Sequence, residues 1–265
     1  MRNISIPLVL TVVFVLPSVT HAYQPKRIQL TDKDETGQQA FMDIHVPVQP
    51  NGTVVLICPG GGYGGLAWNA EGDGIAVWLR SHGITGVALN YRLPKGRNSV
   101  PLSDAQKAIT ELRRLAVEMK FEKIGVMGFS AGGHLASTLA THGKTKRVQP
   151  DFAVLIYPVI TMGEHTHLGS RNNLLGPDPS NELIQRFSNQ LQVDKQTCPT
   201  FLAHAIDDKP VPPINSRLFH DACKKQGVPS VYLELPDGGH GLNGYKGASW
   251  DKWQSESLKW ISQLR

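Results

Sequence analysis

The chain has 265 residues, 40% of them hydrophobic, and carries 27 Lys and Arg residues against 22 Asp and Glu. This composition fits one globular domain, and no internal repeat or low-complexity tract suggests otherwise. The net charge of +5 is spread along the chain, which argues against a nucleic-acid partner. Three cysteines cannot all pair within one chain, so we expect buried free thiols at Cys58, Cys198 and Cys223.

The first 22 residues have the pattern of a secretory signal peptide. Arg2 precedes an apolar run over 4–16, and a short stretch then ends at Ala22, after which we expect cleavage. The run is short for a membrane span, and a retained N-terminal anchor is the alternative. The sequence therefore predicts a signal peptide over 1–22, a single mature domain over 23–265 without stable membrane insertion, and a secreted or periplasmic location.

The first strands of the mature chain lead to a glycine-rich loop. Residues 28–30 and 41–48 predict two leading strands on an antiparallel edge, and the continuously apolar 53–58 predicts a central strand covered on both faces. Pro59-Gly60-Gly61-Gly62-Tyr63 follows and resembles the His-Gly-Gly-Gly loop whose amides bind the substrate oxygen in hydrolases, with proline replacing histidine. Glycine suits such a loop because no Cβ keeps the amides from the oxygen. A plain flexible loop is the alternative.

From residue 71 onward, helical and strand patterns alternate. Helices are predicted over 71–82, 101–120, 131–142, 213–226 and 250–264, and strands over 86–91, 123–128, 152–157, 200–206 and 230–235. This alternation predicts an α/β fold with a mostly parallel central sheet and helices on both of its faces.

Gly128-Phe129-Ser130-Ala131-Gly132 joins a predicted strand to a predicted helix. G-x-S-x-G in this context is the nucleophile elbow of α/β-hydrolases, in which a tight turn raises the serine hydroxyl above the sheet. The alternative is a glycine-rich turn whose serine caps a helix. We predict that Ser130 is a nucleophile.

The periodicity lapses over 161–199, a segment rich in Gly, Asn, His and Pro. Asp178 and Pro179 suggest the start of a short helix with an apolar face over 183–187, and the segment is a possible small cap over the active site. His165 and His167 form an H-x-H pair that invites a metal interpretation. Only Glu164 lies nearby as a further ligand, so we predict no metal site.

A serine hydroxyl needs a base to remove its proton, and the base needs a carboxylate to fix its tautomer. The chain offers Ser130, Asp207 or Asp208, and His240 in the α/β-hydrolase order, each on a loop after a predicted strand. Such loops meet at one edge of a parallel sheet, where ligands bind.

Among the histidines, His240 alone follows the last strand on a glycine-flanked turn. His134 lies inside the helix after the elbow and His204 inside a buried strand, where a hydrogen-bonded structural imidazole is the better interpretation. We therefore predict that His240 is the base.

Four motifs carry a resemblance to a known family: VVLICPGGGY at 54–63, GVMGFSAGGHLA at 125–136, HAIDDKPVP at 204–212 and GGHG at 238–241. With them the chain resembles the secreted bacterial acetylxylan-esterase-like α/β-hydrolases, and feruloyl esterases of the same type are close. The resemblance covers nearly the whole mature chain. It implies a carboxylic-ester hydrolase that acts on decorated plant or algal polysaccharide such as xylan. A long acyl chain would need a substantial apolar lid, and the segment over 161–199 is polar, so we expect short acyl groups, above all acetyl, to be removed.

The resemblance also implies roles for particular residues. Its D-x-x-V-P pattern selects Asp208 as the triad acid, with Asp207 as a neighbour that caps the loop. The amides of Gly61, Gly62 and Ala131 would hold the oxyanion, and no metal or organic cofactor is required.

Other activities remain compatible with the motifs. A serine peptidase related to prolyl oligopeptidase shares the triad order, although such enzymes usually carry an extra N-terminal domain. A non-catalytic hydrolase-fold protein that binds a sugar or a partner normally lacks a triad member, and none is missing here. The natural ester and the oligomeric state stay open.

Overall fold

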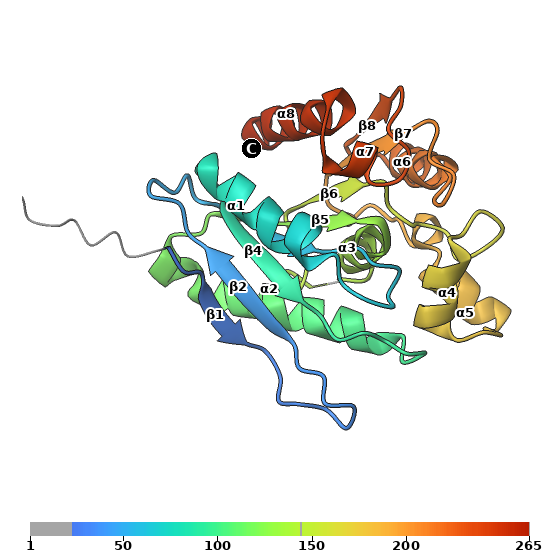
Figure 1. Cartoon of the computed structure of the whole chain (residues 1–265), viewed down its shortest axis with the longest axis horizontal. Coiled ribbons are helices and arrows are strands. Elements are labelled where there is room, and N and C mark those ends of the chain that lie inside the picture. Colours follow the sequence, from blue (N-terminus) through green and yellow to red (C-terminus); the bar gives the residue numbers. More distant parts are fainter. Residues whose placement is uncertain (1–22, 144, 265) are drawn as a thin grey trace, which may run out of the picture.

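The computed structural model describes residues 23–143 and 145–264 (Figure 1). The predicted signal peptide lies outside these residues. Eight strands form one sheet: β1 (Lys26–Gln29), β2 (Phe41–His45), β3 (Thr53–Cys58), β4 (Thr85–Asn90), β5 (Lys123–Phe129), β6 (Phe152–Ile156), β7 (Thr200–Ala205) and β8 (Ser230–Leu235). Their order in the sheet is β1-β2-β4-β3-β5-β6-β7-β8. β1 and β2 pair antiparallel at one edge and the other strands run parallel, as predicted.

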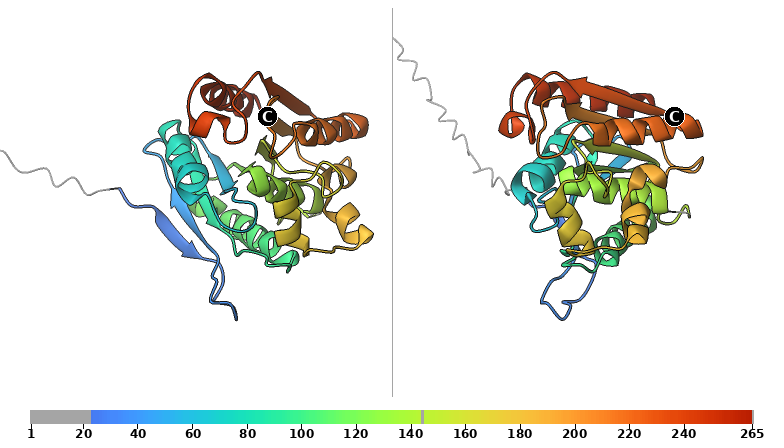
Figure 2. Two further views of the ribbon diagram at one scale, coloured as in Figure 1. Left: turned by 45° about the vertical axis from the view of Figure 1, so that its right-hand side comes forward. Right: turned by 90° about the vertical axis from the view of Figure 1, so that its right-hand side faces the viewer.

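Helices cover both faces of this sheet (Figure 2). They are η1 (Trp68–Asp73), α1 (Gly74–Ser81), α2 (Ser99–Met119), α3 (Ser130–His142), α4 (Leu168–Leu175), α5 (Asn181–Phe187), η2 (Asn189–Leu191), α6 (Ile214–Gln226), α7 (Leu242–Tyr245) and α8 (Ala248–Gln263). The apolar sides of α2, α3 and α6 pack into one core, and those of α1 and α8 into the core on the opposite face. This arrangement confirms the predicted α/β-hydrolase fold.

The centre of the sheet brings two predicted site loops together. β3 and β5 are adjacent and parallel, and Cys58 at the end of β3 lies opposite Gly128 near the end of β5. Carboxyl ends of parallel strands emerge at the same edge. The glycine loop after Cys58 and the elbow at Ser130 therefore leave the sheet side by side.

Several boundaries differ from the predictions. The second strand ends at His45, and a π-helix from Trp68 precedes the helix expected to begin at residue 71. The short helix over 181–187 is capped by Ser180, whose Oγ accepts a hydrogen bond from the Leu183 amide, and not by Asp178.

Helix α4 was not predicted. Only a few of its side chains are buried, so it lacks the apolar periodicity by which a helix is recognised. Its N-cap is His167, whose Nδ1 accepts from the Ser170 amide at 3.2 Å, in place of the usual Ser, Thr, Asp or Asn.

The three cysteines are buried and free, which confirms the prediction, and burial raises the pKa of each thiol. Within the described ranges, no helix has both the length and the apolar character needed to cross a membrane.

Candidate active site

The elbow holds Ser130 in a strained backbone conformation at the junction of β5 and α3. Its φ is +53°, a value that residues other than glycine rarely adopt, and such strain occurs mainly at functional sites. The turn closes tightly because its glycines lack side chains: a Cβ on Gly132 would collide with the carbonyl oxygen of Cys58, and one on Gly128 with that of Gly132. Ser130 is thereby held against the end of β3.

A substitution can test this packing. We expect Gly132→Ala to lower the free energy of unfolding by about 2–3 kcal/mol, since the main chain at Cys58 and Pro59 must move away from α3 to admit one methyl group. Urea unfolding measures the effect. Gly163→Ala is the control because its Cβ would meet nothing nearer than Thr161 Oγ at 3.4 Å, so equal losses in both variants would contradict the steric argument.

The structure brings Ser130, His240 and Asp208 into one chain of hydrogen bonds. His240 Nε2 lies 2.9 Å from Ser130 Oγ, and His240 Nδ1 lies 2.8 Å from Asp208 Oδ2. The three residues follow β5, β8 and β7, so they share the carboxyl edge of the sheet. Ser130 and Asp208 are buried, whereas the His240 side chain keeps 27% of its surface exposed. The imidazole therefore links a buried carboxylate to a serine at the surface of the pocket.

Asp208 is held by more than the imidazole of His240. Its Oδ1 accepts from the Val211 amide at 3.0 Å, and its Oδ2 also lies 3.2 Å from Nε2 of the buried His204. Burial raises the pKa of this carboxyl, but the hydrogen bonds from His204, His240 and Val211 outweigh it and lower the pKa to about 2. Asp208 is therefore ionised at neutral pH.

Asp207 has a different partner. Its side chain is exposed, and its Oδ1 accepts a hydrogen bond of 2.8 Å from the amide of Gly239. It thus fastens the turn that carries His240, a role in which Asp207 holds a second loop where the prediction had it cap its own. No hydrogen bond among the described residues joins it to the imidazole.

The other two histidines weighed as bases are fully engaged. His134 bonds to the Tyr63 hydroxyl at 2.9 Å and to the Phe187 carbonyl at 2.8 Å, and burial lowers its pKa to about 4. His204 bonds to Ser216, Val211 and Asp208. Both are buried structural imidazoles, as predicted.

The glycine loop lies directly beside Ser130. Gly61 and Gly62 have φ of +121° and +64°, and a Cβ on Gly61 would collide with the carbonyl of Gly65. Asn173 Nδ2 on α4 donates to the Gly62 carbonyl at 2.9 Å and anchors the loop. Among the hydrogen bonds between described residues, none uses the amide of Gly61 or Gly62 as donor. Ala131 contributes a third amide at the positive N-terminal end of α3.

These groups surround a pocket of about 350 Å³. Its walls are Gly61, Gly62, Ala67, Glu71, Ser130, His167, His240 and Tyr245. The serine hydroxyl, the imidazole bonded to it and the amides of the glycine loop converge on one space, which is the arrangement that acyl transfer needs. Within the described part of the chain, no group of three His, Cys, Asp or Glu side chains could hold a metal ion.

Comparison with models of known protein families identifies the family of this chain. The BD-FAE model matches residues 42–223, which include the glycine loop, Ser130 and Asp208. The chain belongs to the BD-FAE family.

Relatives of this BD-FAE chain are linked to xylan by name. The chain is 32% identical to the acetylxylan esterase of Xylanibacter ruminicola, in a match that covers 97% of this chain and 55% of that protein. It is 33% identical to endo-1,4-beta-xylanase B of Butyrivibrio fibrisolvens, in a match that covers 71% of this chain and 32% of that protein. The chain thus spans about half of the first relative and a third of the second. The acetyl ester-xyloside bifunctional hydrolase of Caldicellulosiruptor lactoaceticus is similar in structure, with a TM-score of 0.83, 33% identity and coverage of 92% of this chain and 98% of that one.

Four wall residues of the BD-FAE pocket, Ala67 among them, were not predicted as site residues. Glu71 and Tyr245 belong to no motif, and His167 was considered only as a metal ligand. His167 caps α4 beside Gly62, and its pKa is lowered by burial and next by the neighbouring His240. Its partner in the H-x-H pair, His165, is exposed and uses its carbonyl to accept from Asn215. The two histidines therefore lie in different environments, His167 in the wall of the pocket and His165 at the exposed surface.

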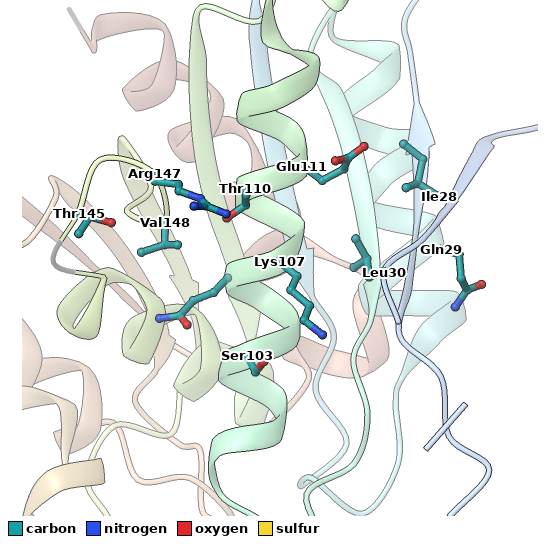
Figure 3. Close-up of a pocket in the computed structure, with 11 residues that line it drawn as sticks. Ile28, Gln29, Leu30, Ser103, Lys107, Thr110, Glu111, Thr145, Arg147 and Val148 are labelled. Carbon is teal, nitrogen blue, oxygen red and sulfur yellow. The ribbon is translucent and has the colours of Figure 1, made fainter. Parts of the chain in front are cut away.

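A larger groove of about 630 Å³ lies between β1, α2 and the loop over 145–148 (Figure 3). Its polar side chains include Lys107, Glu111 and Arg147, and it holds neither Ser130 nor His240. Size alone would favour this groove, but the hydrogen-bonded Ser130 and His240 of the BD-FAE chain lie at the smaller pocket.

Proposed function

We propose that this protein is a serine carboxylic-ester hydrolase that removes acetyl groups from acylated carbohydrate, with xylan as the principal polymer. The observation that carries the proposal is the hydrogen-bonded chain Ser130–His240–Asp208 at the wall of a pocket with unpaired amides. Its relatives support the substrate class, because one is named an acetylxylan esterase and another an acetyl ester-xyloside hydrolase.

The reaction begins when Ser130 Oγ attacks the ester carbonyl carbon and His240 Nε2 takes the serine proton. Asp208 keeps the imidazole in the correct tautomer and stabilises its positive charge. The carbonyl oxygen becomes an oxyanion, which the amides of Gly61, Gly62 and Ala131 stabilise. His240 then protonates the departing sugar oxygen, and an acetyl-enzyme remains.

The second half of the reaction restores the enzyme. Water enters beside the acetyl group and His240 removes its proton, so that hydroxide attacks the acyl carbon. The same amides hold the second oxyanion. Its collapse releases acetate and returns the proton to Ser130, so no metal or cofactor takes part in any step. The signal-peptide pattern over 1–22 supports a secreted or periplasmic location, which is part of this proposal.

We expect the enzyme to prefer short acyl groups. With a pocket of about 350 Å³ there is little room for a long chain beside the sugar. In a series of p-nitrophenyl esters, kcat/KM should fall from acetyl to butyryl and be at least about tenfold lower for octanoyl. Acetate release from acetylated xylan, measured alongside ferulate release from feruloylated xylan, tests the natural ester.

Three other results would change this assignment. An optimum at eight carbons or longer, with no acetate released from xylan, would contradict the proposal and indicate an esterase for lipids. Ferulate release in excess of acetate would move the assignment to a feruloyl esterase. Cleavage of peptide amides in preference to esters would indicate a peptidase.

A further inference from the structure

Glu71 is a buried carboxylate at the active site that the mechanism above does not use. It lies on η1, is 3% exposed, and lines the pocket together with Ser130 and His240. No lysine or arginine in the described ranges forms an ion pair with it. Burying a carboxylate without a cation is costly, so such groups are retained chiefly where they have a function.

Three hydrogen-bond donors offset the cost of burying this carboxylate. Glu71 Oε2 accepts from the Gly60 amide at 2.7 Å, and Oε1 accepts from the hydroxyls of Tyr157 at 2.9 Å and Tyr245 at 3.0 Å. Burial raises the pKa of Glu71, and these donors oppose the rise. The carboxylate thus joins the glycine loop after β3 to the residue after β6 and to α7.

The bond to Gly60 connects Glu71 to the nucleophile. A Cβ on Gly60 would lie 2.5 Å from Glu71 Oε2 and 3.0 Å from Ser130 Cβ, so glycine at this position sits between the carboxylate and the serine. The Gly60 amide points toward Glu71 and is used there. The next two amides, those of Gly61 and Gly62, remain without a donor bond among the described residues.

We propose that Glu71 is a positioning residue for the ester hydrolysis proposed above: its carboxylate fixes Gly60 and thereby holds the amides of Gly61 and Gly62 in place for the oxyanion. The inference rests on that proposed function. Tyr157 and Tyr245 act through Glu71, because their hydroxyls fix the carboxylate that receives the Gly60 amide. The tyrosine at 157 also packs against the ring of His240, with centroids 5.0 Å apart, so one network aligns the base and the oxyanion amides.

Glu71→Gln tests the proposal. The glutamine keeps the Gly60 bond only when its oxygen faces that amide and its NH2 group faces the two hydroxyls, which must then accept where they donated before. The remaining bond from Gly60 then ends on a neutral oxygen, which is a weaker acceptor than a carboxylate. We expect kcat for p-nitrophenyl acetate to fall about 10- to 100-fold, somewhat less than when an oxyanion donor is deleted, with KM within about threefold. The affinity for an aryl trifluoromethyl ketone, whose adduct with serine carries an oxyanion, should fall by a similar factor.

Two further variants separate positioning from stability. Asp43→Asn removes another buried carboxylate, which pairs with Arg27 across the edge strands β1 and β2, and it should lower the melting temperature without changing kcat. Tyr245→Phe removes one of the three donors to Glu71 from a residue that is 37% exposed, and should lower kcat about two- to fivefold. If Glu71→Gln does not fold, the milder Tyr245→Phe variant still tests the proposal.

The outcomes are distinct. Folded Glu71→Gln protein with kcat and ketone affinity within twofold of the parent overturns the inference, and so does a fall in kcat with unchanged ketone affinity. Either result would leave the proposed ester hydrolysis intact. A parent protein that neither cleaves esters nor reacts with a serine-directed phosphonate would overturn the proposed function, and the role of Glu71 with it.

Discussion

Replacing Ser130 with alanine is expected to lower ester turnover by about three orders of magnitude or more while the protein stays folded. The hydroxyl is the only group at the elbow that can form the acyl-enzyme, and the residual rate would come from the amides and from substrate binding. Alanine removes one oxygen from a buried position and adds nothing to the tight turn. Initial rates with p-nitrophenyl acetate and acetylated xylan measure the loss.

Ser137→Ala is the matched control for this variant. Ser137 lies on the same helix, is fully buried, and bonds to the His134 carbonyl and to Asn189, so its loss tests the effect of deleting a buried hydroxyl outside the pocket. Its turnover should stay close to that of the parent. If Ser130→Ala also kept its activity within tenfold of the parent, the serine would have no place in the mechanism.

Asp208→Asn should reduce kcat by about a hundredfold or more, whereas Asp207→Asn should change it by less than about threefold. The 2.8 Å bond from His240 Nδ1 to Asp208 Oδ2 fixes the imidazole tautomer, and an asparagine amide can present its NH2 group there instead. Asp207 only accepts from the Gly239 amide, which an asparagine oxygen also does. Steady-state kinetics of both variants at pH 7–8 make the comparison.

The two variants must be compared at a pH at which Asp208 is ionised in the parent protein, and the pKa of this carboxyl sets that range. Its folded-state pKa of about 2 lies below the value of about 3.9 expected in the unfolded chain. The ionised carboxylate therefore stabilises the fold above about pH 4, and this contribution is lost as the pH falls toward 2. At pH 7–8 it is fully present in the parent. Greater damage from Asp207→Asn than from Asp208→Asn would show that the triad acid has been assigned wrongly.

Much of the fold could be predicted because its signals are local. Apolar strands alternating with amphipathic helices indicated a parallel sheet, and the turn at 128–132 has a spacing that few other structures require. The order of Ser130, Asp208 and His240 along the chain then placed three polar groups at the same edge. The choice between the two adjacent acids rested on the resemblance alone, and the structure adds a physical reason: the Val211 amide bonds to Asp208.

The unpredicted features depend on contacts between distant segments. The three donors to Glu71 lie 11, 86 and 174 positions away from it, so no window of sequence contains the site that they form. Helix α4 was missed because an imidazole caps it and only three of its eight residues are buried. Both features depend on tertiary packing, which hydrophobic periodicity and helix propensity along the sequence do not report.

The register of β3 against β5 has a consequence for how this site tolerates change. The pairing of Cys58 with Gly128 is made by main-chain hydrogen bonds, and a slip of one residue would move the glycine loop by about 3.3 Å relative to the serine. Exchanges among Val, Ile and Leu along these strands alter the filling of the core but leave that ladder in place. Such substitutions in β3 and β5 therefore leave Ser130 and the amides of the glycine loop aligned. The positions that tolerate substitution least are the glycines where these strands end, since a Cβ there would collide with neighbouring main chain.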